Sequence, residues 1–146
     1  MVASPIGRSV TLLAAIVACA AVSGCGSDDG SDKDAAADRA AVRSVYGKMR
    51  TALQKGDGTT ACSLMVVRTQ REFAKLGEAV GGTCEAGFAT LLERVDERPP
   101  TPTLVAIEVD GDKAVVTART PTSKRPQRAP FIRERGTWRV SNWFRD

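Results

Sequence analysis

The chain has 146 residues, of which 42% are hydrophobic and 26% charged, with a formal net charge of +4 and no histidine. This length suits one small globular domain with accessory segments rather than several domains. The charge is unevenly spread: residues 1–24 carry one charge, residues 28–38 hold five aspartates against one lysine, and the remainder is basic. We therefore expect three physically different parts.

The N-terminal part is typical of a targeting segment. Residues 10–22 form an uncharged run of small and aliphatic side chains that follows a single charge, Arg8. A helix of this length falls short of the roughly 20 residues that cross a bilayer core, so an h-region of a signal peptide fits better. The alternative is an N-terminal anchor helix that is never removed.

The residues that follow the apolar run indicate which kind of signal peptide this is. Val22-Ser23-Gly24-Cys25 resembles a bacterial lipobox, which has an aliphatic or small residue, two small residues and a cysteine at the cleavage point. The resemblance covers about 25 residues. It implies that Cys25 receives diacylglycerol on its sulfur, for which a thiolate is the suitable nucleophile, and becomes the new N-terminus. Residues 1–24 would then be a lipoprotein signal peptide, and the protein would be held on the extracytoplasmic face of the cell membrane.

Residues 25–37 are expected to form a flexible acidic tether. The segment after Cys25 has no aromatic or β-branched residue that could repay the entropy of ordering. Its acidic residues would be repelled by anionic headgroups, or the segment is an ordinary linker without a tuned charge. The domain itself is expected to span residues 38–146.

The four cysteines separate into different roles. Cys19 lies in the apolar run and Cys25 is assigned to the lipid, which leaves Cys62 and Cys84. Outside the cytoplasm, two such cysteines more often pair than stay free. Free buried thiols remain an alternative. A metal site is the poorer one, because the chain has neither a histidine nor a C-x-x-C pair.

Four helices are expected before residue 100. In the first, apolar residues recur at helical spacing, Asp34 or Asp38 caps the start, and Gly56 ends it in the left-handed conformation. A second helix holds residues 59–65, with Thr59 or Thr60 as its cap. A third begins at Thr69, where Thr69-x-x-Glu72 matches a capping box, and a fourth follows Thr83. The apolar positions of the first helix are Val42, Val45, Tyr46, Met49 and Leu53.

Alternating patterns after Pro102 predict two antiparallel hairpins. In residues 103–109, Val105, Ile107 and Val109 are expected on one face, and residues 110–112 form a tight turn into residues 113–120. A proline-rich basic loop leads to residues 129–135, and Gly136 turns the chain into a last strand. The expected fold class is α+β, with the N-terminal helices packed on a curved antiparallel sheet of about four strands.

These elements resemble the nuclear transport factor 2-like superfamily over residues 38–144. The resemblance lies in V-x-x-V-Y-x-x-M-x-x-A-L-x-x-G-D from Val42, in the cysteine pair around the next helices, and in R-G-T-W-R-V from Arg135. It implies a curved sheet wrapped around a helix as a cone. The superfamily includes ketosteroid isomerases, small-molecule binders and many exported lipoproteins. A cystatin-like arrangement is the close alternative.

Function has to be argued from a site rather than from the fold. Enzymes of this superfamily place an acid or base inside the cone, whereas this chain has no histidine and one tyrosine. An isomerase- or dehydratase-like enzyme is therefore the less favoured reading, and no cofactor or metal is expected. The favoured reading is a non-catalytic module that binds a small apolar molecule in the cone or interacts with another envelope component. The candidate pocket lining is Tyr46, Phe131, Trp138 and Trp143, unless these residues simply fill the core.

A basic surface is the second candidate site. It would present its charge to anionic lipid, wall polymer or a protein, unless the charges are only a solvated surface. The residues are Lys124, Arg125, Arg128, Arg133 and Arg135. Nucleic acid is not an expected partner despite a pI near 9.1, because the positive charges are scattered and an exported protein rarely meets DNA.

Overall fold

The computed structural model describes residues 29–94 and 100–142. The predictions for the signal peptide, for Cys25 and for Trp143 lie outside these residues. The helices are α1 (Asp29–Lys55), α2 (Gly58–Ser63), α3 (Val67–Leu76), the 3₁₀ turn η1 (Glu78–Val80) and α4 (Cys84–Glu93). The strands are β1 (Thr103–Asp110), β2 (Lys113–Arg119), β3 (Gln127–Glu134) and β4 (Thr137–Val140).

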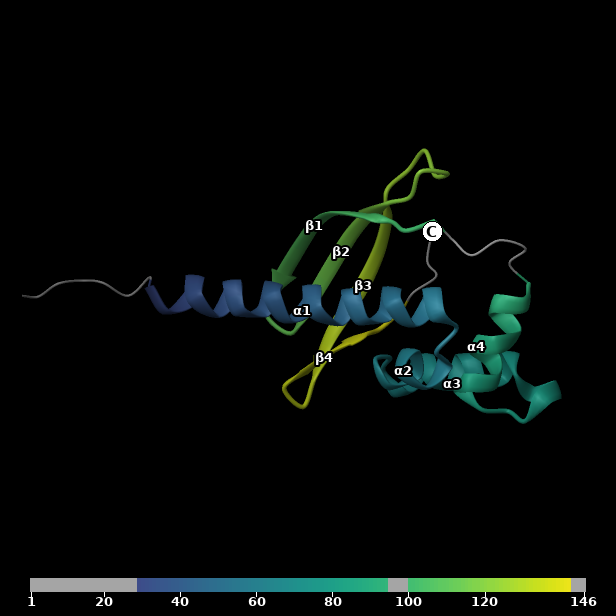
Figure 1. Cartoon of the computed structure of the whole chain (residues 1–146). Coiled ribbons are helices and arrows are strands. Elements are labelled where there is room, and N and C mark those ends of the chain that lie inside the picture. Colours follow the sequence, from purple (N-terminus) through teal and green to yellow (C-terminus); the bar gives the residue numbers. More distant parts are fainter. Residues whose placement is uncertain (1–28, 95–99, 143–146) are drawn as a thin grey trace, which may run out of the picture.

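The four strands form one curved antiparallel sheet in the order β1-β2-β3-β4, and α1 crosses one of its faces (Figure 1). The three shorter helices gather near the C-terminal end of α1. The fold class is therefore α+β, as the change from helical to alternating periodicity predicted. All residues that the structure shows buried lie between Val42 and Val140, so the described core is made wholly by the part of the chain after the acidic segment.

The face of α1 that meets the sheet is the one its apolar periodicity predicts. Val42, Tyr46, Met49 and Ala52 are all buried there. They pack in one cluster with side chains from the sheet and from the shorter helices. The helix ends as expected at Gly56, which has a φ of +70°, a conformation that glycine adopts without steric penalty.

The start of α1 differs from the sequence expectation. Residues 29–37 were expected to be part of a flexible tether, but they form the first turns of the helix, which extends beyond the sheet in Figure 1. Helix propensity favours the helix here, because residues 35–37 are alanine, the residue with the highest propensity.

Strand β1 contains an irregularity that the alternating pattern did not predict. Val105 was expected on the same face as Ile107 and Val109, but it is 56% exposed, whereas those two residues pack against the core. The register shifts between Leu104 and Ala106, which pair with consecutive residues of β2. This bulge reverses the side to which Val105 points, and Leu104 packs against the core instead. In β2 the side chains alternate regularly, with Ala114, Val116 and Ala118 buried.

The helices α2 and α3 begin at other residues than expected. Asp57, rather than Thr59 or Thr60, caps α2, and its carboxylate accepts hydrogen bonds from the Thr60 amide (2.9 Å) and hydroxyl (2.6 Å). The capping box at Thr69 is wrong, because α3 begins at Val67 and Thr69 lies inside it, buried. The Thr69 hydroxyl instead donates to the Ser141 carbonyl at 2.6 Å, which ties α3 to the chain after β4.

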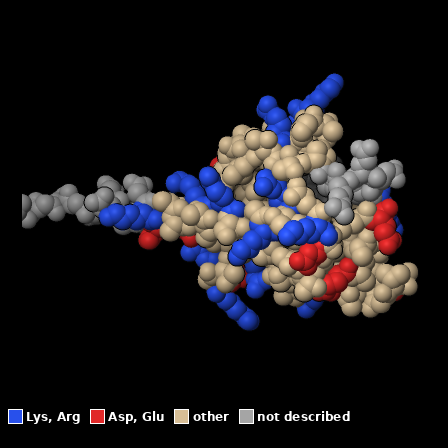
Figure 2. All heavy atoms as spheres, viewed as in Figure 1, with Lys and Arg blue, Asp and Glu red and all other residues tan. Residues whose placement is uncertain are grey.

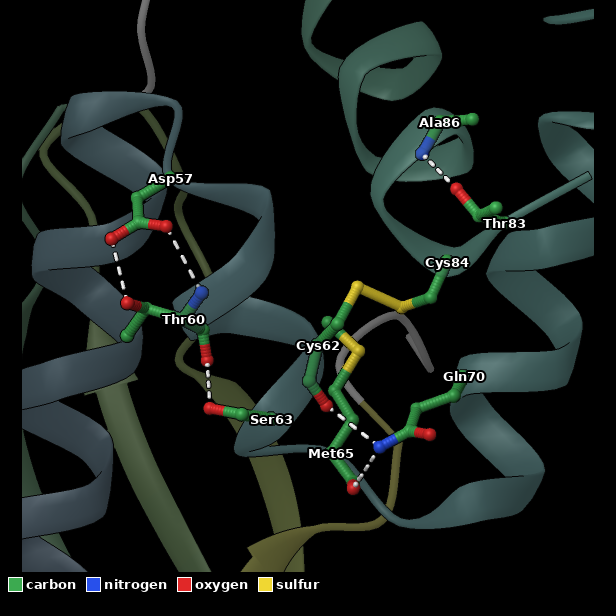
Figure 3. Close-up of a disulfide and its surroundings, with 9 residues drawn as sticks. All are labelled: Asp57, Thr60, Cys62, Ser63, Met65, Gln70, Thr83, Cys84 and Ala86. Carbon is green, nitrogen blue, oxygen red and sulfur yellow. Dashed lines mark hydrogen bonds between the residues drawn. A yellow bond between two sulfur atoms is a disulfide. The ribbon is translucent and has the colours of Figure 1, made fainter. Parts of the chain in front are cut away.

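The fourth helix starts as expected after Thr83, whose hydroxyl accepts a hydrogen bond from the Ala86 amide at 3.1 Å. Figure 3 shows Cys84, the first residue of α4, joined by a disulfide to Cys62 of α2. Gln70 connects α3 to the same region, because its side-chain amide donates hydrogen bonds to the backbone carbonyls of Cys62 and Met65. The three helices α2, α3 and α4 are thus linked to one another, and we call them the helical lobe.

Candidate binding surfaces

Three of the four residues expected to line a pocket belong to the filled core. Tyr46, Phe131 and Trp138 are only 4%, 1% and 4% exposed, and all three belong to the main core cluster. Neither of the two hollows described below is lined by them. The reason is that α1 packs directly onto the four-stranded sheet, so buried side chains such as Met49 of α1 and Val116 of β2 fill the space that an open cone would leave. Trp143 lies outside the described residues.

Burial also determines the protonation of Tyr46. Desolvation raises the pKa of its hydroxyl above the usual value, and the nearby positive charge of Arg50 opposes this shift in part. The neutral phenol is therefore the stable form at ordinary pH. A tyrosine in this state is poorly suited to act as a base, because it releases its proton only at high pH.

Arg133, expected on a basic surface, is engaged inside the molecule. Its guanidinium forms an ion pair with Asp38 of α1 and a second one with Asp112 at 3.3 Å. The same group lies over the ring of Trp138, 4.8 Å from its centroid, in a cation–π contact. The indole N–H of Trp138 donates to the other Asp38 oxygen at 3.2 Å. Arg133 therefore joins α1 to β3 and β4 and does not present a free charge.

The other four basic residues of that prediction are exposed, but they do not form one patch. Lys124 and Arg125 lie in the loop before β3, and Arg135 lies in the turn after it. These positions are at opposite ends of an eight-residue strand, which is about 25 Å long. Arg128 is also exposed and faces Glu108 at 3.5 Å, so its charge is partly balanced.

A denser basic surface lies on the outer side of α1, and the sequence reasoning above missed it. Figure 2 shows lysine and arginine side chains spread over the face of the molecule on which α1 lies. Between residues 39 and 55 the helix has five basic residues and no acidic one, which is a signal that the sequence itself contains. A hollow of about 380 Å³ lies here. Its lining is Arg43, Ser44, Gly47, Lys48, Thr51, Ala52, Lys55, Asp57 and Thr60.

A second, larger hollow of about 900 Å³ lies between the helical lobe and β3. Phe73 and Leu76 of α3 and Leu91 of α4 line one side, and Pro130 and Ile132 line the other. Leu76 and Ile132 are 47% and 37% exposed, so the rim of this groove is partly apolar. Charged groups stand at its edges, namely Arg68, Glu72 and Glu134. Arg68 and Glu72 form an ion pair along α3 at 3.4 Å.

The described residues give no sign of a metal centre or of a membrane-spanning helix. Within residues 29–94 and 100–142 no three His, Cys, Asp or Glu side chains gather as a metal-binding group. In the same part of the chain, no helix has the length and apolarity needed to cross a bilayer. Comparisons of the chain with protein-family models, with curated proteins and with solved structures found no match.

Proposed function

We propose that this protein is an exported lipoprotein, anchored to the outer face of the cell membrane through Cys25, whose domain is a non-catalytic binding or interaction module. The observation that carries the anchoring is the order of sequence features: an uncharged apolar run, Val22-Ser23-Gly24-Cys25, and then a polar acidic segment. Two acyl chains on one cysteine are enough for stable attachment. The domain is a member of the nuclear transport factor 2-like superfamily or its cystatin-like neighbour in this proposal, which the helix on a curved sheet supports.

Replacement of the cysteine tests the anchor. Full-length protein and a Cys25→Ser variant are expressed in a bacterium fed with an alkyne-labelled fatty acid, and membrane and soluble fractions are compared. The wild type should carry the label and sediment with membranes, whereas the variant should lose both. Cys19→Ser is the matched control, because this cysteine precedes the cleavage point and should be dispensable. Membrane attachment of the Cys25→Ser variant without label would favour an uncleaved helix and contradict the proposal.

A small apolar ligand in the groove between the helical lobe and β3 is a second candidate function. The groove volume of about 900 Å³ supports it, because pockets for small molecules commonly measure 300–1,000 Å³. A carboxylate on the rim should expel such a ligand, so Leu76→Asp and Ile132→Asp should each abolish ligand retention in native mass spectrometry. Val105→Asp places the same charge at an exposed valine of β1 outside the groove lining and serves as the control. Wild-type protein that retains no apolar compound would exclude this function.

A further inference from the structure

The outer side of α1 has a regular arrangement of basic and small residues. Successive residues of an α-helix are 100° apart, so residues spaced by three or four lie along one line of the surface. Two rows of basic residues follow such lines, and a strip of small residues lies between them. We call this arrangement the α1 furrow. Its first row is Arg39, Arg43 and Arg50, its second row is Lys48 and Lys55, and its floor is Ala40, Ser44, Gly47 and Thr51.

The floor of the furrow is open. A Cβ atom built on Gly47 would meet nothing within 4 Å, although the glycine lies in the middle of the helix. The hollow of about 380 Å³ covers the part of the furrow from Arg43 to Lys55 and continues to Asp57 and Thr60 beyond it. The floor also offers hydroxyl groups, because Ser44 and Thr51 line the hollow and the Thr51 hydroxyl, which donates to the Gly47 carbonyl, can still accept a hydrogen bond.

Within the described residues the charges of the furrow are not balanced by ion pairs, although the charge of Asp57 interacts with that of Lys55. None of its five basic residues makes an ion pair there, whereas Arg68, Arg128 and Arg133 elsewhere on the molecule all do. Moreover, the Nε atom of Arg50 is enclosed and has no hydrogen-bond partner in that part of the chain. Like charges four residues apart, such as Arg39 and Arg43, repel each other and disfavour an isolated helix. Bound anions would remove this repulsion.

We propose that the α1 furrow binds a linear polyanion, a polymer with a phosphate or carboxylate group on each repeating unit. The basic residues extend from Arg39 to Lys55, a rise of about 24 Å along the helix, which matches several repeats of an extended chain. Arginine on one side can hold an anionic group through two hydrogen bonds, and lysine on the other acts as a point charge. Asp57, whose carboxylate is held in the α2 cap, marks the end of the furrow where an anion is no longer favoured.

The hollow of about 380 Å³ favours a single chain over a bilayer surface as the occupant, because a chain can enter a hollow that a flat sheet of headgroups would only cover. The inference rests on the surface of α1 and does not depend on the lipid anchor, so it can fail or hold independently of the attachment at Cys25.

The test uses residues 26–146, which contain every residue that the structure shows buried. Binding to inorganic polyphosphate and to polygalacturonate, as phosphate and carboxylate probes, is measured by fluorescence anisotropy over a range of salt concentrations. Arg43→Gln with Lys48→Gln should weaken binding on the order of tenfold and reduce the slope of log affinity against log salt by roughly 1.4. Arg71→Gln with Lys75→Gln removes the same charge from exposed positions of α3 that form no ion pair within residues 29–94 and 100–142, and should change little.

Gly47→Leu separates binding in the furrow from general attraction between opposite charges. It leaves the charge unchanged and favours the helix, but its side chain fills the floor. Polymer binding should therefore fall several-fold, while circular dichroism reports an intact fold. Equal losses from both double variants, an unaffected Gly47→Leu variant, or no binding by the wild type at 50 mM salt would each overturn the proposal. Binding only to phosphatidylglycerol vesicles would assign this face to the membrane instead.

Discussion

Gly47 and Gly87 are both helical glycines, but the space around them differs. A Cβ atom on Gly87 of α4 would lie 1.7 Å from the backbone oxygen of Phe73, in α3. Gly77, at the end of α3, also lies close to α4, since its Cβ would lie 2.4 Å from the Gly87 nitrogen. These two glycines therefore set the distance at which α3 and α4 cross. Nothing lies within 4 Å of the corresponding position at Gly47.

Alanine substitutions at these two glycines should consequently have opposite effects. Gly87→Ala should lower the free energy of unfolding by about 3 kcal/mol, because the methyl group meets backbone that cannot move without separating the helices. Gly47→Ala should raise it by about 1 kcal/mol through helix propensity alone. Urea denaturation followed by circular dichroism measures both. A stabilised Gly87→Ala variant would show that the close crossing of α3 and α4 is not a feature of the protein in solution.

Tyr46 predicts a loss of stability at high pH. Burial raises the pKa of its hydroxyl, despite the opposing charge of Arg50, while in the unfolded chain the group ionises near pH 10. The contribution of Tyr46 to the free energy of unfolding is therefore fully present below pH 10. It is lost as pH rises above that value, because the unfolded state releases the tyrosine proton more easily than the folded state does. Tyr46→Phe should show a weaker decline of stability above pH 10 than the wild type.

The titration of Tyr46 can be observed directly, because it is the only tyrosine of the chain. The absorbance of tyrosinate near 295 nm should appear in the native protein only above pH 10, and at about pH 10 in urea-unfolded protein. Coincident titration curves for the two states would contradict the enclosed position of this side chain.

At the scale of elements, Asp38 is the main polar link between α1 and the strands β3 and β4. Asp38→Ala removes the partner of both Arg133 and the Trp138 indole N–H, and should lower the free energy of unfolding by about 2 kcal/mol. Asp34→Ala is the matched control, since this aspartate lies one turn earlier on α1 with an exposed side chain. The double variant Asp38→Ala/Arg133→Ala should lose less free energy of unfolding than the sum of the losses in the two single variants. Strict additivity would show that the ion pair contributes nothing.

The elements whose buried face repeats regularly were predictable from the sequence, and those fixed by a single tertiary contact were not. The apolar repeat of α1 and the alternation in β2 predict their buried faces correctly. The bulge at Val105 leaves no trace in an alternating pattern, because Leu104 and Val105 are equally apolar. Likewise, Thr69 matches a helix cap in the sequence, and only the position of Ser141 in space shows that its hydroxyl bonds elsewhere.

The candidate sites were harder to predict, for related reasons. Whether Tyr46 and Trp138 line a cavity or fill a core depends on how closely α1 approaches the sheet, which no local pattern encodes. The charge of Arg133 is similarly balanced by Asp38, 95 residues earlier. The α1 furrow, by contrast, could have been found, because the absence of acidic residues between positions 39 and 55 is visible in the sequence once the helix is placed.

At the scale of the whole molecule, the helical lobe shares the core cluster with α1 and the sheet, and a few hydrogen bonds attach it to β4 and the residue that follows it. Met65 forms a single parallel bridge with Val140 of β4, and Thr69 bonds to the Ser141 carbonyl. Within the lobe, α3 packs mainly on α4, and the Cys62–Cys84 disulfide joins α4 to α2, which in turn contacts α1. The disulfide thus adds a covalent link to the packing of α4 on α2, and through α2 to the helix that carries the furrow.

Removal of this disulfide should therefore reduce the local stability of the lobe more than that of the sheet. Cys62→Ala with Cys84→Ala should lower the free energy of unfolding by about 3 kcal/mol. The reason is that the disulfide, which joins residues 22 positions apart, lowers the conformational entropy of the unfolded chain. Hydrogen exchange should accelerate more in α3 and α4 than in β2, which is paired on both sides. Reduction of the wild type should reproduce both changes, and the double variant should be insensitive to reductant. Uniform acceleration across lobe and sheet would mean that the domain opens only as one unit.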